Sequence, residues 1–304
     1  MRKFIISDLH GNGNVYHSIM SYLDNVLNEE EIELYINGDL IDRGIDSADM
    51  LLDIKKRIED NKYPIIYLAG NHELMMYEMF EKRRKNLYIP PINDWYRNGG
   101  GVTDYGLSSL LNKDKDKIFE VVDFISNLKI YHKFPETIDY KNIVLVHAAC
   151  PVIVKDDCDI TLKDNNDVTY YAVWTRELDP YIPFRCRVGH SEYFTIVGHT
   201  PNDNKYGVEY HLSQDYLNID GASSMYVCGY FNYDHIPLVE VCDNYLKILT
   251  FNNNNEIIYG NYFTDYKLVP MNEDELNKER GNLDNSFKPK KLIKLLDGRI
   301  DYEK

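Results

Sequence analysis

Six side chains that could bind metal ions follow short apolar segments of this sequence. They are two aspartates, one asparagine and three histidines: Asp8, His10, Asp39, Asn71, His147 and His199. The apolar segments that precede them are typical of β-strands, so each side chain is expected just beyond the end of a strand. Ligands and catalytic groups of α/β proteins collect at such strand ends. The sequence therefore predicts that these residues meet in one site.

The types of these side chains indicate the kind of metal. Carboxylate, amide and imidazole groups together suit Mn, Fe, Zn or Co better than Ca or Mg alone. Asp8 and His10 are two residues apart, so both can face one ion at the end of a strand. Asp39 can bridge this ion to a second one. The ligands of the second ion would be completed by Asn71, His147 and His199.

Three further residues within the same segments indicate phosphoester chemistry. Two ions about 3.5–4 Å apart would hold a phosphoryl group and lower the pKa of a bound water. His72, directly after Asn71, is free to act as a general acid. Asp42 is placed to hold the His72 ring, and the guanidinium of Arg43 is suited to phosphate oxygens. The set predicts a metal-dependent hydrolase of phosphate esters.

Composition and charge exclude several other classes. The 304 residues are 44% apolar and 27% charged, as in ordinary globular proteins. A net charge of −15 argues against bulk nucleic-acid binding. The first residues do not resemble a signal peptide, and no segment approaches the roughly 20 apolar residues of a membrane span. We therefore expect a cytoplasmic, monomeric protein without a membrane partner, in which the five scattered cysteines are reduced thiols.

The periodicity of apolar residues predicts an α/β fold, which some schemes would call α+β. Helical spacing at 15–27, 48–58 and 72–80 alternates with the strands of the N-terminal half, as in βαβ units. We interpret 86–128 as an insertion over the sheet edge that ends in a helix at 116–128. Further strands are predicted at 142–147, 194–198, 208–212, 216–220, 237–242, 245–251 and 256–260. Two sheets packed face to face, with helices outside, fit this order.

The domain boundary is placed near residue 265. Residues 1–265 would form the domain, and 266–304 are charged and sparsely apolar. We expect the latter to be a loosely docked tail. Within it, 290–296 has the pattern of a short amphipathic helix.

Five sequence blocks resemble the PPP-type serine/threonine protein phosphatases of the calcineurin-like metallophosphoesterase fold. The blocks are Asp8-Leu9-His10-Gly11, Gly38-Asp39-Leu40-Ile41-Asp42-Arg43-Gly44, Gly70-Asn71-His72-Glu73, His147-Ala148 and Gly198-His199-Thr200. Finer detail is similar to the bacterial and phage branch, at 95–100, 173–177 and 218–222. The resemblance covers about residues 1–225.

The resemblance implies a four-layer β-sandwich of two mixed sheets flanked by helices. It also implies two divalent ions, with manganese expected first and iron or zinc as alternatives. One ion would be held by Asp8, His10 and Asp39, and the other by Asp39, Asn71, His147 and His199. Arg43 and Arg176 would bind the substrate phosphate, and Asp42 and His72 would form the acid pair. Phosphorylated proteins would be the substrates.

One departure from the family pattern concerns substrate binding. Family members usually carry arginine just before Gly-Asn-His-Glu, where this chain has Ala69. Either one phosphate-binding side chain is missing here, or another residue supplies it, and Arg97 is a candidate.

Two other functions are compatible with such a site. A nucleotide-directed hydrolase of the same fold, such as a diadenosine tetraphosphate hydrolase or an RNA-end phosphatase, more often has Gly-Asn-His-Asp. Glu73 and Asp42 therefore favour the protein phosphatase. A noncatalytic phosphoprotein-binding module would have a damaged ligand set, and the six predicted ligands are all present.

Overall fold

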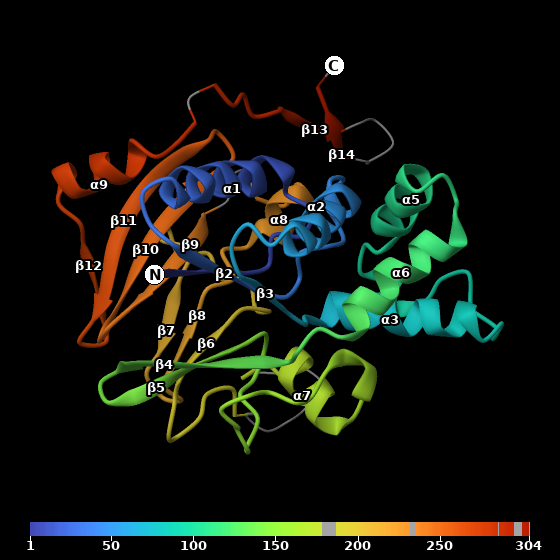
Figure 1. The fold of residues 1–304 in the computed structure, drawn as a ribbon, viewed down its shortest axis with the longest axis horizontal. Helices are drawn as coiled ribbons and strands as arrows, with labels where there is room; N and C mark the ends of the chain where they lie inside the picture. Colours follow the sequence, from blue (N-terminus) through green and yellow to red (C-terminus); the bar gives the residue numbers. More distant parts are fainter. Residues whose placement is uncertain (178–186, 232–234, 285, 295–299, 304) are drawn as a thin grey trace.

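Two mixed β-sheets pack face to face in the computed structural model, which describes residues 1–177, 187–231, 235–284, 286–294 and 300–303 (Figure 1). The first sheet has the order β12 (Lys267–Pro270), β11 (Glu256–Thr264), β10 (Tyr245–Asn252), β9 (Ile236–Cys242), β1 (Arg2–Ile6), β2 (Ile32–Asn37) and β3 (Ile65–Leu68). The second has the order β4 (Tyr131–Ile138), β5 (Lys141–Val146), β6 (Phe194–Val197), β8 (Tyr216–Asn218) and β7 (Glu209–His211). The predicted α/β class with two mixed sheets is confirmed.

Helices flank the two sheets. Those of the N-terminal half are α1 (Gly13–Leu27), α2 (Ser47–Asp60) and α3 (Asn71–Arg84). Those of the predicted insertion are α4 (Asp94–Arg97), α5 (Gly101–Leu110) and α6 (Lys115–Ser126). Later in the chain come the 3₁₀ turn Leu162–Asp164 and the helices α7 (Asp167–Trp174), α8 (Ser223–Val227) and α9 (Glu273–Arg280). Figure 1 shows α1 and α2 over the outer face of the first sheet and α7 on the far side of the molecule. No helix in the described part of the chain is long and apolar enough to span a bilayer.

Strand β1 shows why the central strands are apolar throughout. Its side chains alternate between two faces: Ile5 joins the core between the sheets, whereas Phe4 and Ile6 pack beneath the helices. All three are at most 1% exposed. Because both faces are covered, the strand reads as a continuous apolar run rather than an alternating one. Strands β1, β2 and β3 lie side by side and parallel, so their carboxyl ends lie at the same edge of the sheet.

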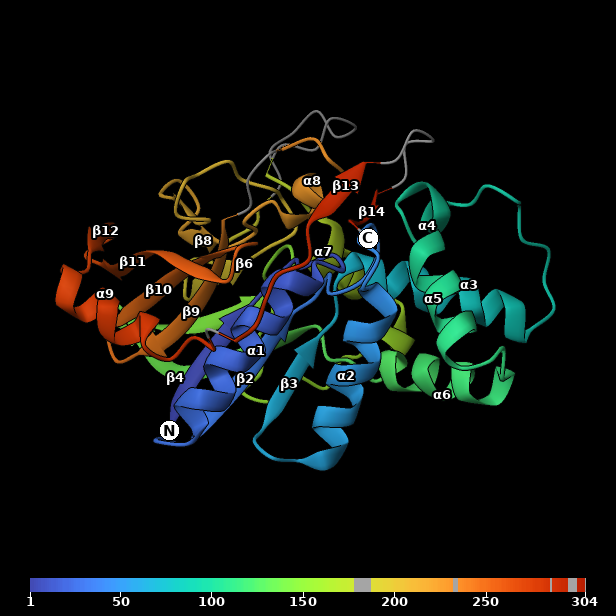
Figure 2. The ribbon, with the colours of Figure 1, turned by 90° about the horizontal axis from the view of Figure 1, so that it is seen from above.

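The insertion forms helices that pack on the N-terminal half. Helix α5 lies against α2, and α6 lies against α3 (Figure 2). Met75, Met76 and Met79 of α3 are buried. Strand β4 was not predicted, because Pro135 interrupts its pattern. It lies at the edge of the second sheet, and its pairing with β5 shifts register between Lys133 and Thr137, around this proline.

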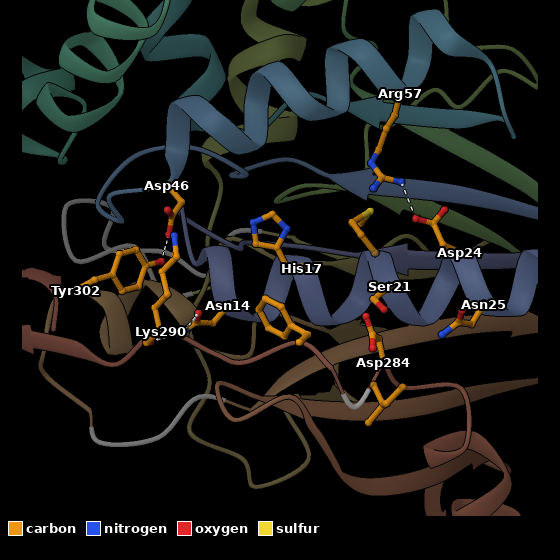
Figure 3. A pocket seen from close by; sticks show the side chains of 13 residues that line it. Asn14, His17, Ser21, Asp24, Asn25, Asp46, Arg57, Asp284, Lys290 and Tyr302 are labelled. Atoms are coloured by element: carbon orange, nitrogen blue, oxygen red, sulfur yellow. Dashed lines mark hydrogen bonds and ion pairs between the residues drawn. The ribbon is translucent and has the colours of Figure 1, made fainter. Parts of the chain in front are cut away.

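The segment after residue 265 makes specific contacts with the rest of the molecule. β12 extends the first sheet, and Asn14 of α1 exchanges two hydrogen bonds with the Lys290 backbone, at 2.6 and 2.9 Å. The Tyr302 hydroxyl donates to the Asp46 carboxylate beside the start of α2 (Figure 3). The domain boundary at 265 stays a prediction, but the described part of the tail is docked.

The prediction of a helix at 290–296 is wrong for the residues of this segment that the structure describes. Leu292–Lys294 forms strand β13, which pairs antiparallel with β14 (Ile300–Tyr302), and residues 295 and 296 lie outside the described residues. A segment of seven residues is too short for periodicity to separate a helix from a strand, and strand pairing decides its conformation.

A buried ionic cluster attaches α9 to the first sheet. Glu279, which is 8% exposed, accepts hydrogen bonds from Lys247 at 2.5 Å and from the Tyr22 hydroxyl. Lys247 also pairs with Glu240 at 3.3 Å, and Arg2 donates twice to Glu240 at 2.7 Å. Burial opposes ionisation of Glu279, but Lys247 and Tyr22 outweigh it and lower the pKa of this carboxyl below its ordinary value of 4.5.

Replacing Glu279 by glutamine is expected to destabilise the protein by about 1–3 kcal/mol at neutral pH, because charged hydrogen bonds are lost. A lowered pKa contributes stability above the unfolded value of 4.5, and this contribution disappears as the pH falls through the folded value. The difference between wild type and Glu279→Gln in denaturant unfolding should therefore shrink below pH 4.5. Asp274→Asn, an exposed change on the same helix, is the control. A pH-independent difference would contradict this account.

Candidate metal centre

Five strand ends from both sheets converge on one site. Asp8 and His10 follow β1, Asp39 follows β2, and Asn71 begins α3 after β3. His147 and His199 follow the parallel neighbours β5 and β6 of the second sheet. The ends are joined directly: the backbone N–H of His199 donates to Asp8 at 3.0 Å, and that of Gly198 donates to the His147 carbonyl at 2.8 Å. The six predicted ligands are all at most 4% exposed.

Several site residues adopt a left-handed backbone conformation, which is uncommon for residues other than glycine. The φ angles are +54° at Asp8, +46° at His10, +50° at Asp39 and +67° at His199. Aspartate and histidine tolerate this region better than branched residues do. Such conformations persist only where the surroundings hold them, and they turn each side chain sharply out of its strand direction. Gly38, with φ of +77°, has no room for a side chain, because an added Cβ would lie 2.8 Å from His147 Nδ1.

The Asp39 carboxylate lies at the centre of the site. One oxygen is 3.5 Å from His10 Nε2 and 3.9 Å from His72 Nε2, and the other is 3.4 Å from His147 Nε2. Two groups of potential ligand atoms, each within 4.8 Å of one another, share this residue: His10, Asp39 and His72, and Asp39, His147 and His199. Asp39 is thus placed where a bridging ligand would be.

The hydrogen-bond network leaves electron lone pairs pointing at one another on the His147 side. His147 Nδ1 donates to the Asn37 carbonyl at 2.8 Å, which leaves Nε2 as an acceptor facing Asn71 Oδ1 at 3.1 Å. His199 Nε2 donates to the Trp174 carbonyl at 3.1 Å, which leaves Nδ1 facing the same Asn71 oxygen at 2.9 Å. When both rings are neutral, as metal ligation requires, these acceptors meet without a donor. A cation fits this arrangement. The other nitrogen of each ring donates to a backbone carbonyl, which is the type of partner that orients metal-binding histidines.

The His10 side is arranged in the same way. His10 Nδ1 donates to the Ile41 carbonyl at 3.1 Å, and Nε2 faces Asp39 and accepts from Arg43 at 3.2 Å. Asp8 lies at the inner edge, where it accepts hydrogen bonds from Ser7 and from the His199 backbone. Among the described residues the two compact ligand groups do not include Asp8. Its assignment to the first ion remains a prediction.

The buried titratable groups of the site shift one another's pKa values. Burial, together with the nearby Asp220 and Asp39 carboxylates, raises the pKa of Asp8. Burial alone would lower the pKa of His147, but Asp39 and Asp8 raise it to about 10. Burial and the neighbouring Arg43 lower the pKa of His10, and burial and Arg176 lower that of His199. Crowded carboxylates beside imidazoles are a donor set suited to divalent transition ions.

The predicted contact between His72 and Asp42 is present, and its role in catalysis stays a prediction. His72 Nδ1 donates to Asp42 at 2.7 Å, and both side chains are at most 1% exposed. Asp42 has two further donors that the sequence did not predict: Trp95 Nε1 at 2.7 Å and the Thr103 hydroxyl at 2.5 Å. They come from the insertion, which therefore helps to build the site. The resemblance at 95–100 marked this segment, but nothing in the sequence pairs Trp95 with Asp42.

Glu73 holds the ends of β2 and β3 together, a role that was also missed. Its carboxylate accepts the backbone N–H groups of Asp39 at 2.8 Å, Leu40 at 3.1 Å and Gly70 at 3.0 Å, and the Tyr67 hydroxyl at 2.7 Å. It is fully buried. Glu73 therefore fixes the backbone that carries Asp39, although it does not face the open pocket.

A pocket of about 500 Å³ opens over these groups. Its lining includes His10, Asp39, Asn71, His72 and His199. The arginines in its wall are Arg43, Arg97 and Arg176, two of them predicted to bind phosphate. The cavity thus brings together four of the six metal-ligand candidates, His72 and three cationic side chains.

The chain belongs to the calcineurin-like phosphoesterase family, whose model matches residues 1–236. It is similar to a protein serine/threonine phosphatase from Saccharomyces cerevisiae with similarity to human phosphatase PP5, at 14% identity and a TM-score of 0.53, covering 83% of this chain and 79% of that one. It is also similar to a cold-active protein-tyrosine phosphatase of a psychrophilic Shewanella species, at 14% identity and a TM-score of 0.51, covering 82% and 77%. No curated protein matches the sequence. At this identity the likeness shows the fold alone.

Metal binding at neutral pH is expected to release about one proton from His147, because its pKa of about 10 leaves the metal-free ring protonated. The affinity for Mn²⁺ should accordingly rise with pH until the ring is neutral. Titration calorimetry in buffers of different ionisation enthalpy measures the released proton. His17→Asn, a change outside the site, should leave the release unchanged. Heats that do not depend on the buffer would contradict the predicted state of His147.

Proposed function

We propose that this phosphoesterase is a metal-dependent phosphomonoesterase that removes phosphate from phosphoserine and phosphothreonine in proteins. The observation that carries the proposal is the His72–Asp42 pair. Asp42 holds Nδ1 at 2.7 Å, so Nε2 points toward Asp39 and the open pocket. A proton donor directed at the site of bond cleavage is needed to hydrolyse an ester with an alkoxide leaving group.

Two divalent ions, with manganese as the first candidate, would be the cofactors. Asp8, His10 and Asp39 would hold one, and the other would be held by Asp39, Asn71, His147 and His199. When bound, such ions polarise a phosphoryl group and lower the pKa of water. The convergence of acceptor atoms around Asp39 and Asn71 supports this assignment.

The protein's own groups then have separate roles. When the His72 ring is neutral, Asp42 favours the tautomer that carries the proton on Nδ1. When both ring nitrogens carry a proton, the Asp42 carboxylate stabilises the positive charge. That ring gives its Nε2 proton to the departing oxygen of the serine or threonine side chain. Arg43 and Arg176 bind the non-bridging phosphate oxygens, for which the guanidinium fork is well shaped. Trp95 and Thr103 position Asp42 and touch no substrate.

Purified protein with Mn²⁺ is expected to release phosphate from a phosphoserine peptide. His72→Asn should lower kcat by about 10²–10⁴-fold while leaving metal content unchanged, because a general acid contributes about that much. His17→Asn is the matched control. The phosphopeptide should also be cleaved faster than diadenosine tetraphosphate or a cyclic nucleotide.

Different outcomes would contradict different parts of the proposal. Absence of turnover with each of several divalent metals would refute phosphomonoester hydrolysis. Faster cleavage of the dinucleotide would replace the protein substrate by a nucleotide. A wild-type rate in His72→Asn would show that His72 is not the general acid.

A further inference from the structure

The end of β3 contributes no positive charge to the catalytic pocket. The residue there is Ala69, which is fully buried and carries no charge. Arg43 is half-buried and directed toward His10 Nε2, at 3.2 Å. Arg176 lies on the His199 side, where its charge lowers the pKa of that ring. The remaining arginine in the wall is Arg97.

Arg97 ends α4, and this short helix is fixed against the acid pair. Trp95, which is 2% exposed, donates to Asp42, and the N–H of Arg43 donates to the Gly99 carbonyl at 3.2 Å. A side chain at Gly100 would collide with the Trp95 ring, so this close packing requires glycine. The backbone of Arg97 therefore has a defined position relative to His72 and Arg43.

The guanidinium of Arg97, in contrast, is held only weakly. Its ion pair with Asp94 spans 3.5 Å, and the two side chains are 65% and 87% exposed. Exposed pairs of this kind contribute little, so the side chain can leave Asp94 for a dianionic ligand. Arg97 lines both the catalytic pocket and a neighbouring groove that contains Met79 and Ile92. It is thus an exposed side chain at the rim of the catalytic pocket.

We propose that Arg97 is a third phosphate-binding arginine, which contacts the substrate phosphate from the α4 side of the pocket. It would supply from the insertion the charge that Ala69 does not supply from β3. A guanidinium on a well-placed backbone, close to solvent and weakly paired, suits bidentate capture of a phosphate. The inference rests on the proposed phosphoester hydrolysis, but phosphate binding tests it separately.

The test compares Arg97→Ala, Arg97→Lys and Lys82→Ala. Lys82 lines the neighbouring groove and not the catalytic pocket, so it controls for loss of a nearby positive charge. Arg97→Ala should raise KM about 5–20-fold for both free phosphoserine and a phosphoserine peptide, with kcat nearly unchanged, because binding is lost equally in ground and transition states. Arg97→Lys should recover part of the loss, and Lys82→Ala should show none.

Binding of inorganic phosphate to the Mn²⁺-loaded protein, measured by calorimetry, gives a readout without turnover. Arg97→Ala should weaken it by a similar factor. If wild type hydrolyses no ester but this weakening is seen, the proposed function fails and the role of Arg97 stands. Unchanged phosphate affinity in Arg97→Ala, or no phosphate binding by wild type, overturns the role. A KM effect confined to the peptide also overturns it, since the contact would then be to the polypeptide.

Discussion

The site depends on keeping one buried carboxylate, that of Asp39, ionised at the junction of two sheets. Burying a charge is costly unless it is paired and hydrogen-bonded. Although burial opposes ionisation, His147 and His72 lower the pKa of Asp39. The backbone N–H of His72 also donates to Asp39 at 3.0 Å. Each surrounding group therefore serves two purposes: it stabilises Asp39 and stands where a metal ion or a substrate needs it. Glu73 completes the arrangement by holding the Asp39 backbone itself.

Because the ligands come from two sheets, the core between the sheets determines the geometry of the site. Ile5 and Leu145 pack in this core and are fully buried. At its catalytic end, Asn37 donates to the Val146 carbonyl at 3.2 Å and accepts the His147 ring proton at 2.8 Å. A core substitution that changes the spacing of the sheets would move His147 and His199 relative to Asp39. Close packing makes such shifts costly, and this protects the site.

The sequence predicted the strand-end residues well, because apolar strands followed by polar ligands are a local pattern. It predicted the two sheets for the same reason. It did not reveal contacts between distant segments, such as Trp95 with Asp42 or Tyr302 with Asp46. Nor did it reveal the left-handed backbone at the ligands, which the folded surroundings impose. Strand β4 was missed because Pro135 masks it, and the contacts of the tail were not foreseen because charged residues can still be held by ionic clusters such as that of Glu279.

The proposed bridging of two ions by Asp39 is tested by the metal content of purified wild type and Asp39→Asn after equilibration with Mn²⁺. We expect about two ions per chain in wild type and a loss of at least one in the variant, since one carboxylate would serve both. Asp243→Asn, an exposed aspartate, should keep both. One ion in wild type, or two retained in Asp39→Asn, would show that Asp39 is not a bridging ligand.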